Sequence, residues 1–403
     1  MNDAKKNDGR RAFPEKIAGI ERNIFFAGLT SFFTDTASKM IYAVMPLFLL
    51  SIGATKTELS LIEGVAESTA SVIKALSGWW SDKIRRNKPF MIIGYAFTAL
   101  LSPLFSIAAT PAQVLAIRFS ERVGKGIRTA PRDSLIAASS DERSKGRSFG
   151  FHKAMDNSGA IAGPLLAAGL LLLFPQDYRL IFLIAGIPGL IGLATIILFV
   201  REARDEKLAP LGKVTFRDFS GRFYMFLGIA FIFTMGNSTD ALLLVKASDV
   251  GVEAALIPVL YLLFYGVSAL FSVPAGIISD KIGRERLIIF GYLLYAAIYY
   301  GFGRTNGTVS MFLLFALYGL YSASTDGVQK ALVSDLIPRD KRGTGLGIYN
   351  CLIGLTLLPA SVIAGLLYDR VNNSVPFYYG SAMALAAALL MLAFYRGGSE
   401  KKK

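Results

Sequence analysis

The sequence predicts an all-α membrane protein in which twelve transmembrane helices form two parallel repeats of six. Three observations predict this fold class. Apolar runs such as 91–109 and 180–200 reach the roughly 20 residues that a helix needs to cross a bilayer. The loops between such runs alternate between basic and nearly neutral, and a motif of the first half recurs in the second half.

Each predicted helix is an apolar run bounded by polar or charged residues. In the first half of the chain, we expect helices near 24–52, 57–80, 89–109, 112–138, 148–174 and 179–200. In the second half, we expect them near 221–247, 254–278, 286–304, 308–337, 344–369 and 375–395.

One polar stretch, 201–220, interrupts this series and divides the chain into two halves. The predicted organisation is a tail at 1–23, a bundle at 24–200, a linker at 201–220, a bundle at 221–395 and a tail at 396–403. The first tail is polar and lacks the apolar core of a secretory signal, so we expect it to stay in the cytoplasm.

Basic side chains indicate the orientation in the membrane. They concentrate in both tails, in the linker and in the loops near residues 83–88, 143–147, 281–286 and 339–342. The loops of the opposite side hold only Lys56, Arg179, Arg304 and Arg370. Because positive residues stay on the cytoplasmic side, we expect both termini and the linker to be cytoplasmic, in the inner membrane.

Composition excludes several classes of site. The chain has one cysteine, Cys351, and one histidine, His152, so it encodes no intrachain disulfide, thiolate cluster or multi-histidine metal site. The formal net charge of +14 is explained by the basic loops without a nucleic-acid partner. A nucleotide-binding loop around Gly124 and Gly126 is excluded because Phe119 stands where such a loop needs glycine.

A loop motif occurs once in each half. Gly276, Asp280, Lys281, Gly283 and Arg284 form the complete version, and Gly78, Asp82, Lys83, Arg85 and Arg86 form a degenerate one. A small residue allows two helices to approach closely, and an aspartate at a helix end can pair with arginines. We expect a cytoplasmic gate formed by Gly78, Asp82, Arg86, Gly276, Asp280 and Arg284, with Arg132 and Asp133 at the end of the fourth helix.

This loop motif resembles the signature of the major facilitator superfamily, and the resemblance of the sequence to a branch of that superfamily covers essentially the whole chain. The resemblance implies a secondary transporter whose two six-helix repeats enclose a central site. Residues 35–46 and the fourth helix, Arg118 to Asp133, resemble a bacterial and archaeal branch of the superfamily that is largely uncharacterised.

A second motif lies in the predicted fifth helix. Gly150, Gly159, Gly163 and Pro164 are spaced so that the glycines can form a close-packing face and the proline a kink. The motif resembles that of the antiporter branch of the superfamily, with Ala167 and Ala168 replacing the usual final glycines. The resemblance implies export by antiport, and generic small-residue packing is the alternative.

Ionisable residues inside the predicted helices are candidates for the transport pathway, because each charge at the bilayer centre costs about 2.5–3.5 kcal/mol or more. The candidates are Asp35, Lys39, Glu63, Glu67, Arg118, Arg122, Lys125, Arg128, Asp156, Asp240, Asp326 and Lys330. Spacing predicts pairs within one helix for Asp35 with Lys39, Lys153 with Asp156, and Asp326 with Lys330. Lys74, Lys246 and Asp335 are expected to reach water near helix ends, and His152 to be a structural hydrogen-bonding group.

Asp35 is the candidate proton carrier, since it lies with Thr34, Thr36, Ser38 and Lys39 in a polar interruption of an apolar helix. The alternative is that Asp35 only neutralises Lys39.

The predicted function is proton-coupled export of a small molecule by a rocker-switch motion of a monomer, with no cofactor and no resident metal. An uptake symporter for an organic or phosphorylated anion and a ferroportin-like metal exporter are the alternatives. A sensor and an intramembrane enzyme are disfavoured, because the tails are short and no nucleophile constellation is present.

Overall fold

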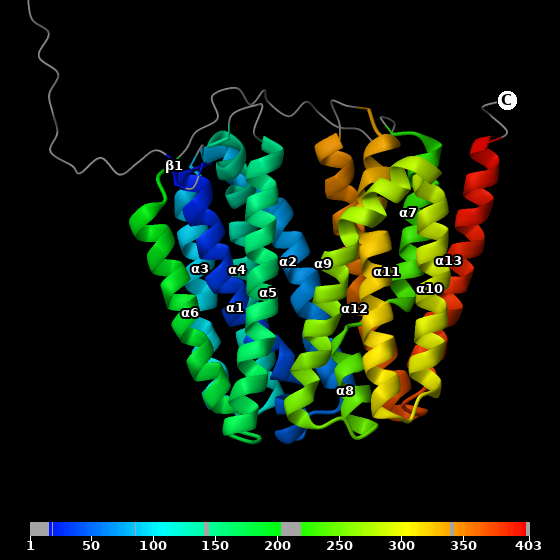
Figure 1. Ribbon diagram of the computed structural model, residues 1–403, viewed down its shortest axis with the longest axis horizontal. Helices are drawn as coiled ribbons and strands as arrows, with labels where there is room; N and C mark the ends of the chain where they lie inside the picture. Colours follow the sequence, from blue (N-terminus) through cyan, green and yellow to red (C-terminus); the bar gives the residue numbers. More distant parts are fainter. Residues whose placement is uncertain are drawn as a thin grey trace, which may run out of the picture.

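The computed structural model describes residues 16–17, 19–84, 86–140, 145–202, 219–338 and 342–399. Within these ranges, the chain is a bundle of long, roughly parallel helices (Figure 1). Nine of the described helical segments are long and apolar enough to cross a membrane. The remaining crossings, α1, α2 and α4, contain many of the intramembrane charges that the sequence predicts. The all-α membrane fold is therefore confirmed.

The first half begins with a two-stranded hairpin, β1 (Lys16–Ile17) and β2 (Ile20–Glu21), in the segment expected to be a plain polar tail. The helices follow: α1 (Arg22–Ser51), α2 (Lys56–Ile84), α3 (Lys88–Leu101), α4 (Pro111–Ala138), α5 (Lys145–Leu173) and α6 (Tyr178–Phe199). The third crossing ends as a 3-10 helix, η1 (Ser102–Ile107). A capping box between Thr110 and Gln113 starts α4.

The second half contains α7 (Gly221–Gly236), α8 (Ala241–Asp249), the short 3-10 helix η3 (Ala254–Leu256) and α9 (Ile257–Ile282). These are followed by α10 (Arg284–Arg304), α11 (Thr308–Asp335), α12 (Arg342–Arg370) and α13 (Val375–Ser399). The prediction of a single helix over 221–247 was wrong in one respect. Residues 237–240 are not helical, so α7 and α8 together make one crossing with a break inside it.

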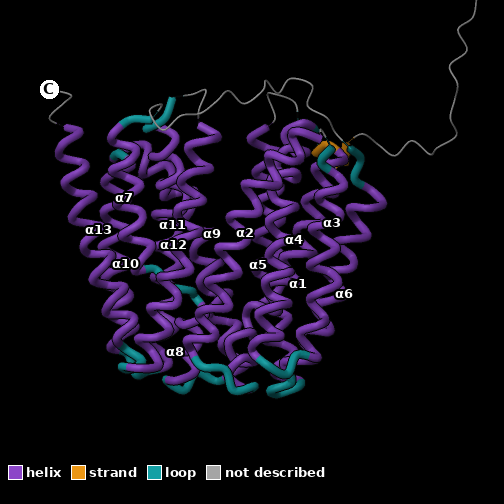
Figure 2. Tube along the Cα trace, turned by 180° about the vertical axis from the view of Figure 1, so that it is seen from behind, coloured by secondary structure: helices purple, strands orange, loops and turns teal. Residues whose placement is uncertain are grey.

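Two groups of helices lie side by side in the bundle. In the first group, α1 packs against α5 and α6, and α4 against α2 and α3. In the second group, α9 packs against α11, and α13 against α10 and α7. The groups meet mainly where α2 packs on α12 and α5 on α9, and Figure 2 shows the two groups from behind.

Successive crossings run in opposite directions, so α1 begins and α13 ends at the same end of the bundle. We call this the termini end and the other the distal end. At the distal end, η3 of the second group packs against α5 of the first. At the termini end, a cavity of about 850 Å³ lies between α5, α9 and α11 and reaches Asp280 and Arg284. The interior between the groups is therefore accessible from the termini end.

Candidate functional site

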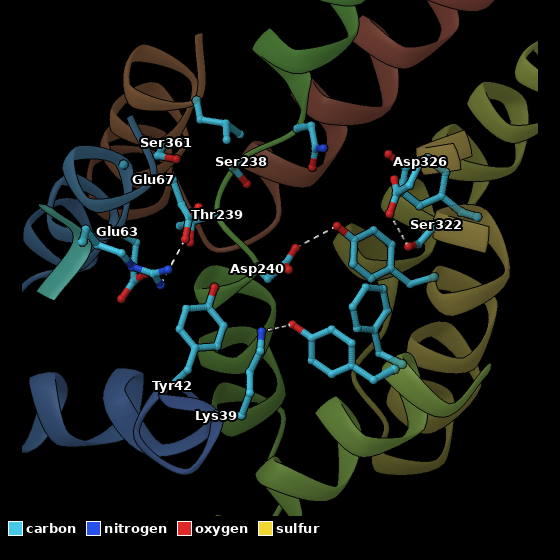
Figure 3. A pocket seen from close by; sticks show the side chains of 18 of the residues that line it. Lys39, Tyr42, Glu63, Glu67, Ser238, Thr239, Asp240, Ser322, Asp326 and Ser361 are labelled. Atoms are coloured by element: carbon cyan, nitrogen blue, oxygen red, sulfur yellow. Dashed lines mark hydrogen bonds and ion pairs between the residues drawn. The ribbon is translucent and has the colours of Figure 1, made fainter. Parts of the chain in front are cut away.

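A second cavity, of about 340 Å³, lies near the middle of the bundle between the two groups and adjoins the larger one (Figure 3). We call it the central cavity. Its lining comes from α1, α2 and α4 on one side and from the α7–α8 break, α9, α11 and α12 on the other. Of the predicted pathway residues, it brings together Lys39, Glu63, Glu67, Arg122, Lys125, Asp240 and Asp326.

The break between α7 and α8 forms part of the cavity lining. Asn237 to Asp240 all line the cavity. Asp240 accepts hydrogen bonds from the hydroxyls of Tyr318 (2.8 Å) and Tyr261 (3.2 Å). The Tyr295 hydroxyl donates to the carbonyl of Gly236, the last residue of α7 (3.1 Å). Side chains thus satisfy polar groups that a broken helix would otherwise leave bare inside a membrane protein.

Asp240 was predicted from the sequence as a pathway residue, but the break and its tyrosines were not. The run Asn237-Ser238-Thr239-Asp240, four polar residues inside an apolar crossing, is the signal that could have located it. The tyrosines carry no comparable signal, because tyrosine recurs throughout this half of the chain.

Lys39 does not pair with Asp35, which corrects the predicted pair within α1. Its Nζ donates to the Tyr265 hydroxyl at 2.5 Å and lies 4.5 Å from the centre of that ring. Tyr265 belongs to α9, so this contact joins the two groups across the central cavity (Figure 3). The i,i+4 spacing was correct for proximity but could not reveal a competing partner on another helix.

Asp35 lies beside a small cavity of about 30 Å³ next to the central one. The basic residues Arg122, Lys125 and Arg128 line the same small cavity. Arg128 is held by the hydroxyl of Thr98 and the ring of Tyr95, whose centre is 4.5 Å from its guanidinium carbon. Within the described part of the chain, the Asp35 carboxylate has no ion pair within 4 Å, although positive charges are close.

A buried ion triad stabilises the contact between α2 and α4. Arg118 is 1% exposed and forms a bidentate pair with Glu63, at 3.0 and 3.1 Å. Its remaining nitrogen, Nη1, donates to Glu121 at 2.9 Å. One turn further along α4, Arg122 pairs with Glu67 at 3.0 Å. The positive charges of Arg118 and Arg122 on α4 are therefore neutralised by carboxylates of α2 and of α4 itself.

Asp156 also pairs differently from the prediction. Its carboxylate lies 3.9 Å from Arg132 and 3.7 Å from Nδ1 of His152, while Lys153 is exposed and lines the larger cavity. The other His152 nitrogen, Nε2, is hydrogen-bonded to Ser31 at 2.9 Å. His152 thus connects α5 to α1, in the structural role that was expected.

Asp326 accepts a hydrogen bond from Ser322 at 2.7 Å, and it does not form the predicted ion pair with Lys330. Both residues line the larger cavity and are exposed. An i,i+4 pair at a water-accessible surface contributes only a few tenths of a kcal/mol, too little to fix the two side chains together.

Among the described gate residues of the loop motif, the charged ones of the second group form ion pairs. Arg284 lies 2.6 Å from Asp335 and 3.8 Å from Asp280, so these charges tie the ends of α9, α10 and α11 together. Arg132 pairs with its neighbour Asp133 at 3.0 Å. Arg86 is exposed, and the surroundings of Gly78 and of the Asp82 side chain lie outside what the structure describes.

Three residues were expected to reach water near helix ends. Lys74 and Asp335 are exposed, as expected, and Asp335 is also the partner of Arg284. Lys246 is only 1% exposed, so the expectation was wrong for this residue. Lys246 belongs to α8, where neighbouring chain segments cover all seven residues from Ala241 to Ala247.

The glycines of α5 fix its distance from α1. A Cβ atom on Gly159 would overlap the carbonyl oxygen of Phe32, and one on Gly163 would lie 2.7 Å from that of Thr36. The Cβ atoms of Asp35 and Lys39 lie at the same contact. A Cβ atom on Gly150 would have no neighbour within 4 Å among the described residues. Gly150 is therefore not part of the packing face, and that prediction was wrong.

We therefore predict that Gly159→Ala destabilises the protein by about 1–3 kcal/mol and impairs transport, because the added methyl must push α5 away from α1. Gly169→Ala on the same helix is the matched control, since its Cβ would meet nothing within 4 Å in the described structure. Unfolding in mixed micelles measures the difference. Equal stability of the two variants would contradict the assigned contact.

The described residues contain no group of three or more histidine, cysteine, aspartate and glutamate side chains placed to hold a metal ion.

The comparisons with known proteins show one family and one fold. The model of the Major Facilitator Superfamily matches residues 27–245 and 225–403. An uncharacterized MFS-type transporter of Methanocaldococcus jannaschii is 36% identical over 384 residues, covering 93% of this chain and 95% of the relative. A probable 4-methylmuconolactone transporter of Cupriavidus pinatubonensis is 24% identical, with 92% and 90% covered. The crystal structure of the nucleoside transporter NupG is similar in fold, with a TM-score of 0.80, 10% identity, and 92% and 99% covered.

Proposed function

Since this chain belongs to the major facilitator superfamily and is a membrane transporter of that type, not an enzyme, we propose that it exports a small molecule in exchange for protons by alternating access. The observation that carries the proposal is the central cavity, which lies between the two groups and is lined by intramembrane charges. We take the predicted bundles 24–200 and 221–395 as the moving units and the inner membrane as the location, with both termini cytoplasmic.

Alternating access requires that one end closes while the other opens. The termini end has the 850 Å³ cavity, and the distal end has contacts that join the groups. The most specific is made by Asp369 of α12. It accepts hydrogen bonds from the backbone N–H of Thr57 (2.7 Å) and Lys56 (3.3 Å), and from the Thr57 hydroxyl (2.6 Å). A carboxylate from the second group thus caps the first turn of α2, an arrangement that stabilises the closed distal end.

We predict that Asp369→Ala favours opening at the distal end, because it removes an exposed carboxylate cap of α2, whose loss costs about 0.5–2 kcal/mol in total. A cysteine at Thr239, in the central cavity, reports the change in a Cys351→Ser background. A membrane-impermeant maleimide added to intact cells should label it at least about fivefold faster when Asp369 is replaced.

Asp177→Ala is the control for this experiment, since Asp177 caps α6 at the same end but within one group. Equal acceleration by both changes would contradict the assignment of Asp369 to the closure.

The same reagent tests the orientation. A cysteine at Asn373, in the exposed distal loop, should react in intact cells, and one at Arg201 should not. The reverse pattern would place the termini outside.

Asp35 is the carboxylate that we assign to the coupling proton. Lys39, one turn away, is held by Tyr265 of the other group. A motion that separates α9 from α1 would release Lys39 and allow it to pair with Asp35. The partner of Asp35 thus depends on the conformation, and a proton-coupled transporter needs a proton site with this property.

Export is supported by the resemblance of the α5 motif to that of antiporters, since Gly159 and Gly163 set the α1–α5 contact beside Asp35. A second candidate is uptake of an anion together with protons. It is favoured by Lys125, which faces both the central cavity and the Asp35 cavity. A bound anion and an ionised Asp35 would compete for this positive charge, so anion binding would favour protonation of Asp35.

Purified protein in liposomes distinguishes these candidates. We predict that a solute screen with an imposed pH gradient finds a substrate that accumulates in the acidic compartment, because antiport moves the substrate against the proton flow. A gradient of about one pH unit supports about tenfold accumulation for one proton per substrate. Accumulation in the alkaline compartment would establish symport instead. Transport that ignores the gradient would contradict proton coupling.

A further inference from the structure

The charges of the central cavity are divided between its two sides. Lys39 and Lys125 come from α1 and α4 of the first group. Asp240 and Asp326 come from the α7–α8 break and from α11 of the second group. In Figure 3, Lys39 lies on the side of α1, Asp326 lies on the opposite side with Ser322, and Asp240 lies between them.

The other charges of this lining are paired within the first group. Arg122 forms an ion pair with Glu67, and Glu63 is held by the buried Arg118. Lys125 is exposed to the cavity and has no ion pair within 4 Å among the described residues. Lys39, Asp240 and Asp326 have hydroxyl partners, from Tyr265, from Tyr261 and Tyr318, and from Ser322. Four charges without an opposite partner in the described protein thus face the cavity, two of each sign.

We propose that the transported molecule is a zwitterion, whose anionic group binds at Lys125 and Lys39 and whose cationic group binds at Asp240 and Asp326. This inference rests on the proposed transport through the central cavity, but not on its direction. A charge in a low-dielectric site needs a partner of opposite sign. A simple anion would leave both carboxylates uncompensated, and a simple cation would leave both lysines uncompensated.

The region around the carboxylates suits an ammonium group with an apolar body. Phe264 and Tyr318 also line the cavity, and their rings are stacked with centres 5.0 Å apart. Tyr318 donates its hydroxyl to Asp240, so the tyrosine ring and the carboxylate are adjacent. An ammonium group bound to Asp240 would gain from a neighbouring aromatic face. The volume of about 340 Å³ is at the lower end for small-molecule pockets, which favours a compact molecule.

Binding to the purified protein tests the inference without a proton gradient. The probes are two matched series: phenylalanine, 3-phenylpropanoate and 2-phenylethylamine, and 5-aminopentanoate, pentanoate and pentylamine. In at least one series, we expect the zwitterion to bind at least about tenfold more tightly than both analogues that carry one charge. The inference is wrong if neither zwitterion binds with a dissociation constant below about 10 mM. It is also wrong if, in both series, a singly charged analogue binds as tightly as the zwitterion.

Charge-removal variants give a second, sharper readout. Lys125→Met should weaken binding of the zwitterion and of the acid but spare the amine. Asp240→Asn should weaken the zwitterion and the amine but spare the acid. Asp326→Asn replaces Asp240→Asn if loss of the Tyr318 and Tyr261 contacts impairs folding. Asp177→Asn, in a distal loop, is the control and should leave all affinities unchanged. Equal weakening of all three probes by each variant would contradict the assignment of the two sides.

The binding and transport experiments can fail separately. Zwitterion binding without transport would sustain the substrate class and contradict the proposed function. Gradient-driven transport of a simple anion or cation, with no zwitterion bound, would sustain the function and overturn the substrate class.

Discussion

Replacing Asp35 by asparagine should reduce gradient-driven accumulation to background, while exchange of substrate between equal pools continues. The reason is that an amide cannot bind and release a proton, although it keeps the size and polarity of the carboxylate. Under a gradient of about one pH unit, the accumulation ratio should fall from about ten to about one. Proteoliposomes that contain the substrate identified by the screen measure both quantities.

Two further variants make this prediction specific. Asp177→Asn, the same change at an exposed cap of α6, should keep full accumulation. The double change Asp35→Asn with Lys39→Met should not restore accumulation, because asparagine at position 35 still cannot carry a proton and Lys39 contacts Tyr265 rather than Asp35. If the double variant does restore it, Asp35 is a charge partner of Lys39 and not the proton carrier.

Replacing Arg118 by methionine should destabilise the folded protein by about 3–5 kcal/mol, the largest stability effect that we expect. The change leaves Glu63 (2% exposed) and Glu121 (4% exposed) buried without their shared cation. Equilibrium unfolding in mixed micelles measures the loss.

Arg122→Met is the matched control, one turn away on α4. Its partner Glu67 has a side chain that is 41% exposed, so water can replace the lost arginine and the cost should be about 1 kcal/mol or less. The triple change Glu63→Gln, Arg118→Met, Glu121→Gln should recover much of the stability, because no unpaired charge remains buried. Equal costs for Arg118→Met and Arg122→Met would show that burial of the triad is not the cause.

The fold could be predicted from the sequence because the bilayer imposes a simple constraint. A backbone in hydrocarbon must satisfy its own hydrogen bonds, so an apolar run of sufficient length becomes a helix. The crossings predicted at 179–200 and 286–304 were placed within two residues of α6 and α10 for this reason. The break at 237–240 escaped the same argument, because its backbone groups are satisfied by neighbours such as Tyr295, which are distant in sequence.

The candidate site could be predicted in composition but not in connectivity. Seven of the twelve pathway candidates line the central cavity, since a charge within an apolar crossing must face either a partner or water. Spacing along a helix predicted three pairs, and none of them is formed. Asp35 and Lys39, Lys153 and Asp156, and Asp326 and Lys330 each have competitors on other helices or in the cavity.

By itself, the sequence therefore determined that the chain crosses the membrane in twelve segments, that it resembles the major facilitator superfamily, and which charges lie within the helical crossings. These properties follow from local hydropathy and from motifs, which are read along the chain. The tertiary structure decided that Lys39 contacts Tyr265, that Arg118 lies between two glutamates, and that carboxylates and lysines face each other across one cavity. The partner of a buried charge is decided by which helices pack together, because electrostatic attraction depends on distance in space and not on separation in sequence.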